Sequence, residues 1–255
     1  MSEIDFGRTA SDYGAFRAGF PEELYERLDK FAIGKAGQSL LDLGTGTGAL
    51  GRGFALRGCA VTGLDPSDAL IEEARRLDGE AGVESDYVTV RAENTGLADD
   101  AFDVVTAGQC WHWFDRARAA SEIRRLLKPG GALVIAHFDW IPLPGNVAEA
   151  TERLIERHNP AWAMGNGTGL PREWLADVAV AGFRDIETFS FDVHTPYSHE
   201  AWRGRIRASA GVGASLSPDA VNRFDDELAE LLAARFPEDP LAVLHRCFAL
   251  VCRAP

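Results

Sequence analysis

The sequence predicts an α/β protein with a mostly parallel sheet and helices on both faces. Between residues 39 and 140, short apolar runs alternate with segments of helical spacing, and the first run leads into the glycine-rich stretch LLDLGTGTGALGRG at residues 40–53. This alternation indicates βαβ units, whose strands are buried on both faces and whose crossovers are right-handed. A hydrophobic content of 46% and a charged content of 25% are typical of a globular domain.

Five strands are predicted in the first part of the chain because each is a short apolar run with turn residues beside it. They span residues 39–44, 59–65, 86–92, 101–108 and 131–140. The helices between them span residues 48–58, 67–77 and 116–128. Ser67 is the expected N-cap of the second helix, and Pro129-Gly130-Gly131 should stop the third.

After residue 140 the alternation weakens, which predicts helical insertions around the last two strands. The expected helices span residues 145–159, 171–183, 198–210 and 217–235, and the expected strands span 184–194 and 242–253. No internal repeat or linker interrupts the chain, so we predict a single domain over residues 1–255. Because ligands bind at the carboxyl ends of strands in such sheets, the residues that follow each strand are the candidates for a site.

Composition argues against several classes of partner. The formal net charge of −13 opposes a nucleic-acid surface, which needs clustered Lys and Arg. The four cysteines are scattered without a CxxC pair, which favours reduced thiols over a zinc site or disulfides. The first residues are too polar for a signal peptide, and no apolar run reaches transmembrane length. We therefore expect a cytoplasmic protein that binds no metal, nucleic acid or membrane.

The glycine-rich stretch permits more than one ligand. A Walker loop is excluded, because no lysine follows the glycines. The dinucleotide fingerprint G-x-G-x-x-G/A fits in two registers, starting at Gly44 or at Gly46, and Asp65 lies about 20 residues further on, where a ribose-binding acid is expected. The carboxylate of Asp42, directly before the loop, would repel a pyrophosphate and favours a cationic ligand.

The motifs LLDLGTGTG, GLDPS, AENTGLADDAFDVV, QCWHWF and LLKPGG follow one another between residues 40 and 136. In this order and spacing the chain resembles the class I S-adenosylmethionine-dependent methyltransferases. Within them, QCWHWFD and the N-terminal YGAFRAGFPEELYERL resemble the methyltransferase type 11 branch that contains the trans-aconitate methyltransferases. The resemblance implies a Rossmann-like, seven-stranded sheet whose last strand is antiparallel. It also implies a helical lid at residues 1–38, a cofactor-binding core at 39–140 and a substrate side at 141–255.

The resemblance gives the loop a ligand, S-adenosylmethionine, which carries a positive charge and no phosphate. Asp42 would face its positive end, and Asp65 would accept hydrogen bonds from the ribose hydroxyls. The expected cofactor residues are Tyr13, Arg17, Asp42, Gly44, Thr45, Gly46, Gly48, Asp65, Pro66, Ala92, Glu93 and Gln109. Arg91 stands where many relatives carry an acidic residue, so backbone groups of Ala92 and Glu93 would supply the adenine contact.

Two histidines and two tryptophans follow the fourth and fifth strands, where the acceptor is expected. His112 is the candidate general base, because a neutral imidazole can take a proton from a hydroxyl or amine acceptor. Trp111, Trp113 and His137 would line the acceptor pocket. The alternative is that the aromatic residues pack a helix start onto the sheet and His112 only orients the loop.

The stretch WRGRIRAS at residues 202–209 is the only local arginine cluster of the chain. In a helix, Arg203 and Arg207 share a face and could bind an anionic acceptor such as a polycarboxylate. We favour the alternative, a solvated face that pairs with neighbouring acids.

The predicted activity is methyl transfer from S-adenosylmethionine to a small-molecule acceptor, at oxygen or nitrogen, with carboxylates among the candidates. S-adenosylhomocysteine would be the released product. The alternatives are an S-adenosylmethionine-binding protein without catalysis, a nicotinamide-dependent dehydrogenase, and an RNA or protein methyltransferase. Both a monomer and a homodimer are compatible with the sequence.

Overall fold

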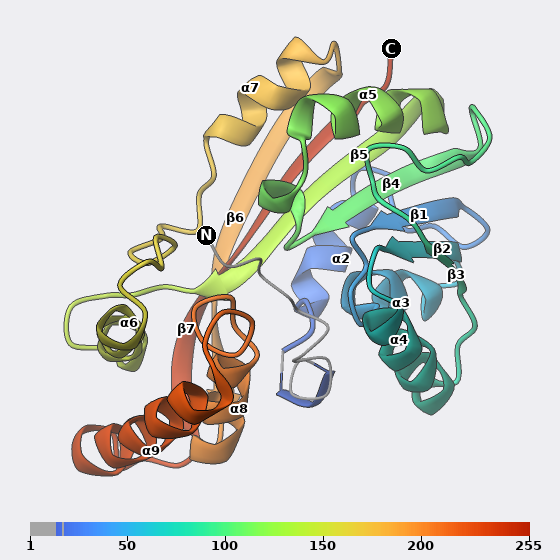
Figure 1. Cartoon of the computed structure of the whole chain (residues 1–255). Helices are drawn as coiled ribbons and strands as arrows, with labels where there is room; N and C mark the ends of the chain where they lie inside the picture. Colours follow the sequence, from blue (N-terminus) through green and yellow to red (C-terminus); the bar gives the residue numbers. More distant parts are fainter. Residues whose placement is uncertain (1–13, 17) are drawn as a thin grey trace. The chain divides into compact units, whose positions relative to one another are not determined.

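The computed structural model describes residues 14–16 and 18–255 (Figure 1). The strands are β1 (Ser39–Leu43), β2 (Ala60–Asp65), β3 (Asp86–Thr89), β4 (Phe102–Gly108), β5 (Leu127–Trp140), β6 (Arg184–Tyr197) and β7 (Leu241–Arg253). The α-helices among the described residues are α2 (Glu22–Asp29), α3 (Ala49–Ala55), α4 (Asp68–Ala81), α5 (Arg116–Leu126), α6 (Val147–His158), α7 (Glu173–Val180), α8 (His199–Arg207) and α9 (Pro218–Arg235). A short 3-10 helix, η2 (Trp111–Trp113), follows β4.

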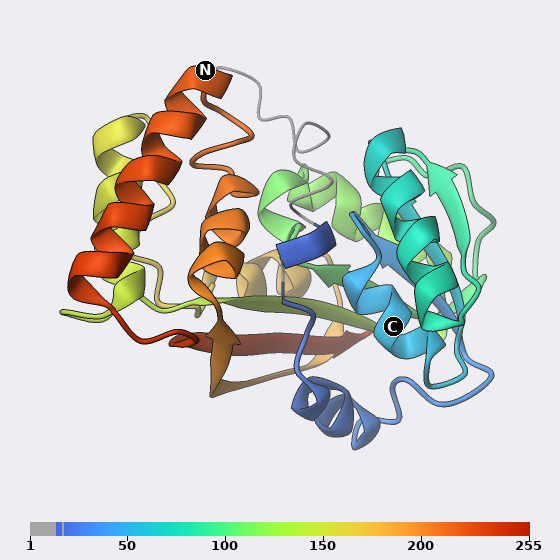
Figure 2. The same cartoon turned by 90° about the horizontal axis from the view of Figure 1, so that it is seen from below.

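The strands form a seven-stranded sheet in the order β3-β2-β1-β4-β5-β7-β6. Neighbouring strands from β3 to β5 are parallel, and Asp42 of β1 lies opposite both Gly63 of β2 and Thr106 of β4. β7 runs against β5, because Ala254 donates to Gly131 near one end of β5 whereas Ile141, just past its other end, donates to Leu244 (Figure 2). The structure therefore confirms the predicted fold class, with its antiparallel last strand.

Several element boundaries differ from the sequence prediction, among them the start of β5 and the end of β3. Helix α5 ends at Leu126, and β5 begins at Leu127 and continues through Pro129-Gly130-Gly131, so these residues lie inside the strand. The physical reason is pairing: Leu127 lies opposite Phe102 of β4, with a register irregularity before Val104 that accommodates the Pro-Gly-Gly stretch. Strand β3 ends at Thr89, three residues before its predicted end.

The chain divides into two compact units. Among the described residues, one comprises 19–138, 170–191 and 247–255, and the other comprises 14–16, 18, 139–169 and 192–246. The first unit contains β1 to β4, most of β5 and helices α2 to α5 and α7, with α2 and α3 on one face of the sheet and α5 and α7 on the other (Figure 1). In the second unit, α9 packs against α6 and α8. The predicted division into a lid at 1–38, a cofactor-binding core at 39–140 and a substrate side at 141–255 stays a prediction.

Each unit has its own apolar core. In the larger unit, β1, β4 and β5 are covered by the apolar stripe of α5, and Leu41, Val105 and Ile123 are fully buried. In the smaller unit, Trp202 of α8 and Phe224 of α9 are fully buried. Such burial contributes about 1.5–3 kcal/mol per large apolar side chain, so these residues hold each unit together.

Local signals explain where the helices begin. Ser67, the predicted N-cap of α4, accepts a hydrogen bond from the Leu70 amide, which confirms that prediction. Helix α4 ends at Gly82, whose left-handed φ of 69° closes the helix as a glycine C-cap does. Over the described residues, no helix combines the length and apolar character needed to span a bilayer.

We expect Leu41→Ala to destabilise the protein by about 2–5 kcal/mol, because it leaves a cavity beside β1, an interior strand of the sheet. Leu41 is 0% exposed, whereas Leu56 at the end of α3 is 60% exposed. Urea unfolding of both alanine variants would measure the difference, and Leu56→Ala should stay within about 0.5 kcal/mol of the unsubstituted protein. Equal losses in the two variants would contradict this account of the core.

Candidate functional site

The glycine-rich loop between β1 and α3 has a backbone that only glycine adopts easily. Gly44, Gly46 and Gly48 have φ values of 58°, 55° and 78°, in the left-handed region. A Cβ atom on Gly44 would lie 2.9 Å from Cβ of Cys110, and one on Gly48 would lie 2.8 Å from the Tyr87 hydroxyl. Conformation and close packing therefore both require glycine here.

Asp42, at the end of β1, lies beneath this loop and is 1% exposed. Its carboxylate accepts hydrogen bonds from the hydroxyl of Thr106 at 2.6 Å and the hydroxyl of Thr45 at 2.7 Å. It also accepts one from the Gly51 amide at 3.2 Å. Burial raises the pKa of Asp42 to about 6, although these three hydrogen bonds act in the opposite direction. Asp42 thus ties β4, the loop and α3 to one carboxylate, and its predicted contact with a ligand stays a prediction.

Asp65, at the end of β2, closes onto the middle of the loop. One carboxylate oxygen accepts from the Gly46 amide at 3.0 Å, and the other accepts from the Ser67 amide at 2.9 Å. Asp65 is 7% exposed, and burial raises its pKa. Since a carboxylate has about four acceptor positions, two of them remain for ligand hydroxyls. The exposed Pro66 follows directly.

A second buried network of hydrogen bonds joins α3, α4 and β3 and supports the loop. No sequence motif predicts it. Arg52 donates to the Thr47 carbonyl at 2.7 Å and forms an ion pair with Asp78 at 2.8 Å. Tyr87 donates to the other oxygen of Asp78 at 2.8 Å. The side chain of Asp78 is 4% exposed, so the pair is stabilised by these hydrogen bonds in a dry environment.

The stretch after β3 leaves the sheet beside the end of β2, because Asp65 and Thr89 are paired. Ala92 is buried and Arg91 is exposed. The carboxylate of Glu93 accepts a hydrogen bond from the Asp115 amide at 3.0 Å, at the start of α5. The structure thus brings Ala92 and Glu93 to the predicted edge, with the Glu93 side chain directed to α5.

Gln109, at the end of β4, has an unusual backbone for a residue with a side chain. Its φ is 62°, and its amide donates to the Ala136 carbonyl at 2.9 Å. The side-chain amide of Gln109 donates to the Phe138 carbonyl in β5. A strained conformation that is held by contacts on both sides is typical of functional sites.

An aromatic cluster follows Gln109. The His112 ring lies 4.5 Å from the Trp113 ring and 6.1 Å from the His137 ring, measured between centroids. The ring of Trp174 in α7 is nearly parallel to His112 at 6.5 Å and edge-on to His137 at 5.7 Å. Trp174 is not among the predicted site residues, because α7 lies outside the motif series.

Two tryptophans of this cluster have different environments. Trp111 is 0% exposed and donates to Asp177 of α7 at 3.1 Å, which agrees with the alternative that it packs the start of a helix. Trp174 is 2% exposed, and its indole N–H has no hydrogen-bond partner among the residues that the structure describes. Burying such a donor without a partner costs about 1–3 kcal/mol. An acceptor atom from a ligand or water would therefore stabilise the Trp174 indole N–H.

The predicted arginines lie in the smaller unit. Arg203 and Arg207 both bind Asp225 of α9, at 3.1 Å and 2.8 Å, and Arg207 also binds Glu200 at 3.0 Å. These contacts agree with the alternative of a face paired with neighbouring acids. Tyr13 and Arg17 lie outside the described residues. In the part of the chain that is described, no three His, Cys, Asp or Glu side chains are grouped to hold a metal ion.

Residues 41–135 match the family profile described as Methyltransferase domain. An uncharacterized methyltransferase of Mycobacterium tuberculosis is 34% identical over 130 residues, which are 51% of this chain and 50% of that protein. The chain spans about half the length of the curated relatives it matches.

Solved structures share the fold at low sequence identity. Phosphoethanolamine N-methyltransferase 2 of Haemonchus contortus, in complex with phosphomonomethylethanolamine and S-adenosylhomocysteine, has a TM-score of 0.60 at 21% identity, covering 100% of this chain and 60% of that one. The 4+2 cyclase SpnF has a TM-score of 0.55 at 22% identity, covering 94% of this chain and 84% of that one. These likenesses show the fold alone.

We expect Asp42→Asn to flatten the pH dependence of stability between about pH 4 and pH 6. Because the folded-state pKa is raised from 3.8 to about 6, the stability contributed by Asp42 is fully present below the lower value and is lost as pH rises through the upper one. The loss amounts to roughly 3 kcal/mol at most. Urea unfolding at several pH values would measure it.

Asp192→Asn is the control for this experiment. The Arg246 guanidinium lowers the pKa of Asp192, so its contribution is lost as pH falls and has the opposite sign. Since the Asp192 side chain is 41% exposed, its effect should be the smaller of the two. Identical pH profiles for the protein and its Asp42→Asn variant would contradict the role of buried Asp42.

Proposed function

We propose that this chain, whose residues 41–135 carry a methyltransferase domain, transfers a methyl group from S-adenosylmethionine to a small-molecule acceptor. The observation that carries the proposal is a loop with three left-handed glycines whose middle one, Gly46, donates to Asp65, all inside the matched residues. The hydrogen bond between Gly46 and Asp65 joins the two features that the sequence assigned to the cofactor.

Sheet topology argues against a nicotinamide-dependent dehydrogenase. Dinucleotide-binding sheets have the strand order 3-2-1-4-5-6 with parallel strands. Here β7 enters between β5 and β6 and runs against β5. In addition, the buried carboxylate of Asp42 lies at the loop, where a pyrophosphate would meet a like charge.

The residues at the strand ends fit S-adenosylmethionine chemically. Asp65 keeps acceptor positions for ribose hydroxyls, and the glycine backbone permits close approach of a ligand. The residues proposed to hold the cofactor are Asp42, Gly44, Thr45, Gly46, Gly48, Asp65, Pro66, Ala92, Glu93 and Gln109, with Tyr13 and Arg17 from outside the described residues. Bound there, S-adenosylmethionine supplies an activated methyl carbon on a sulfonium sulfur.

The proposed acceptor lies at the aromatic cluster. His112 takes the proton from a hydroxyl or amine acceptor, and Trp113 and His137 border the same group of rings. The buried indole N–H of Trp174 favours an acceptor that carries a hydrogen-bond-accepting oxygen, because such an atom removes the cost of the unmet donor. A carboxylate acceptor would need no base, and positioning with exclusion of water would then supply most of the catalysis.

The cyclase among the fold neighbours motivates one alternative, a protein that keeps the fold but catalyses no methyl transfer. Cofactor binding and methyl transfer therefore need separate measurements.

Calorimetry with S-adenosylhomocysteine and with NAD tests the cofactor. We expect saturable binding of the first and none of the second, because the buried Asp42 carboxylate lies at the loop, where a pyrophosphate would meet a like charge. Binding of NAD alone would contradict the proposal. A screen of phenols, amines and carboxylic acids with methyl-labelled S-adenosylmethionine then identifies the acceptor; cofactor binding without transfer to any member would favour the non-catalytic alternative.

On a hydroxyl or amine acceptor found by that screen, we expect His112→Asn to lower kcat by about 10²-fold to 10⁴-fold, because the proton acceptor is removed. The dissociation constant of S-adenosylhomocysteine should change less than about twofold, since His112 lies outside the glycine loop. His194, an exposed histidine of β6, provides the matched control, and His194→Asn should leave both quantities unchanged. Unchanged kcat in His112→Asn would remove His112 as the base.

A further inference from the structure

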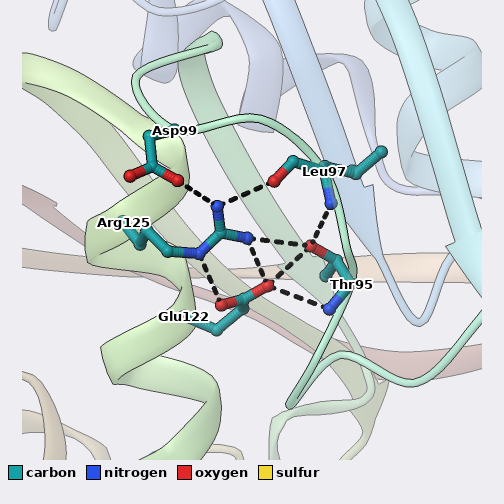
Figure 3. Close-up of polar contacts among 5 residues, drawn as sticks. All are labelled: Thr95, Leu97, Asp99, Glu122 and Arg125. Carbon is teal, nitrogen blue, oxygen red and sulfur yellow. Dashed lines mark hydrogen bonds and ion pairs between the residues drawn. The ribbon is translucent and has the colours of Figure 1, made fainter.

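The stretch that follows Ala92 is fastened to helix α5 through Thr95 (Figure 3). The Thr95 amide donates to the Glu122 carboxylate at 2.9 Å, and the Thr95 hydroxyl donates to the same oxygen at 2.6 Å. Thr95 is 6% exposed, so water competes little for these bonds. Both the backbone and the side chain of one loop residue are therefore fixed by a single carboxylate.

Arg125 holds that carboxylate in place (Figure 3). Its guanidinium binds both oxygens of Glu122, at 2.9 Å and 2.7 Å, in the bidentate geometry that gives strong, directional ion pairs. The same guanidinium donates to the Leu97 carbonyl at 2.7 Å and binds Asp99. Hydrogen bonding to Arg125 holds the pKa of Glu122 at about 2, so the carboxylate stays ionised in ordinary buffers.

The backbone at Ala92, rather than the neighbouring side chains, is the expected source of hydrogen bonds to the adenine of the cofactor. Arg91 is exposed and cationic, so it supplies no carboxylate for an amino group. The Glu93 carboxylate is directed to the start of α5, where it accepts from the Asp115 amide. A backbone contact has no rotamer to adjust, so its geometry depends on where the loop is held.

We propose that Thr95 and Glu122, held by Arg125, are positioning residues that place the backbone of Ala92 and Glu93 against the adenine of the cofactor. The inference rests on the proposed function and adds a specificity mechanism to it. Helix α5 holds the loop at two levels, near its start through Glu93 and two turns later through Thr95. Loss of the second attachment frees the loop to shift while Asp65 and the glycine loop keep their own contacts.

The test measures discrimination between two ligands, which a general loss of stability does not change. The probes are S-adenosylhomocysteine and its analogue whose purine lacks the 6-amino group, both titrated by calorimetry. We expect the unsubstituted protein to prefer S-adenosylhomocysteine about tenfold, the value of about one good hydrogen bond. Thr95→Val removes the hydroxyl at nearly constant shape and should reduce this preference below about threefold, whereas Thr95→Ser keeps the hydroxyl and should retain it.

A matched ion pair on α4 controls for the loss of charge. Arg76 binds Glu73 at 2.9 Å and 2.7 Å with the same spacing of three residues, away from the loop. Glu122→Gln should therefore lower the preference, and Glu73→Gln should not.

Each outcome has a separate meaning. A preference that survives in Thr95→Val, a loss of equal size for both ligands, or the absence of any preference in the unsubstituted protein would overturn the positioning role. If the unsubstituted protein binds neither ligand, the proposed function itself fails.

Discussion

The buried carboxylate of Asp42 is the constraint on which the candidate site depends. It is 1% exposed, and it accepts from Thr106 of β4, Thr45 of the loop and Gly51 of α3. These three groups belong to segments that are distant in the sequence, and one acceptor fixes their separation. The three hydrogen bonds only partly offset the cost of burying the Asp42 charge, and the pKa of Asp42 is therefore raised. The ionised Asp42 thus lowers the stability of the protein near neutral pH while it holds the loop.

Much of the fold follows from the sequence because its signals are local. Short apolar runs locate the parallel strands, Ser67 marks the start of α4, and the spacing between the glycines and Asp65 anticipates the hydrogen bond between Gly46 and Asp65. The predicted start of β5 is wrong, because Pro129 and the two glycines after it are strong signals for the end of a helix and for a turn. Pairing of Leu127 with β4 outweighs them, and no local pattern reports that pairing.

The side-chain contacts that support the site could not be predicted, because they join residues that are far apart in the sequence and belong to no common motif. Arg52 and Asp78 are 26 residues apart, and Trp111 and Asp177 are 66 apart. Trp174 reaches the histidines from a helix whose sequence is ordinary for an amphipathic segment. Such contacts arise once the sheet order is set, so the sequence predicts the glycine loop and Asp65 but not the residues that support them.

The position of β7 has a consequence for how the protein is made. β7 is the last strand along the chain, yet it lies inside the sheet, between β5 and β6. During vectorial synthesis on the ribosome, β6 emerges with no neighbour to pair with, and β5 presents an open edge until Leu241–Arg253 has left the exit tunnel. Strands β1 to β5 can assemble early, but the sheet closes only after β7 has emerged, and until then its open edges are exposed to edge-to-edge association.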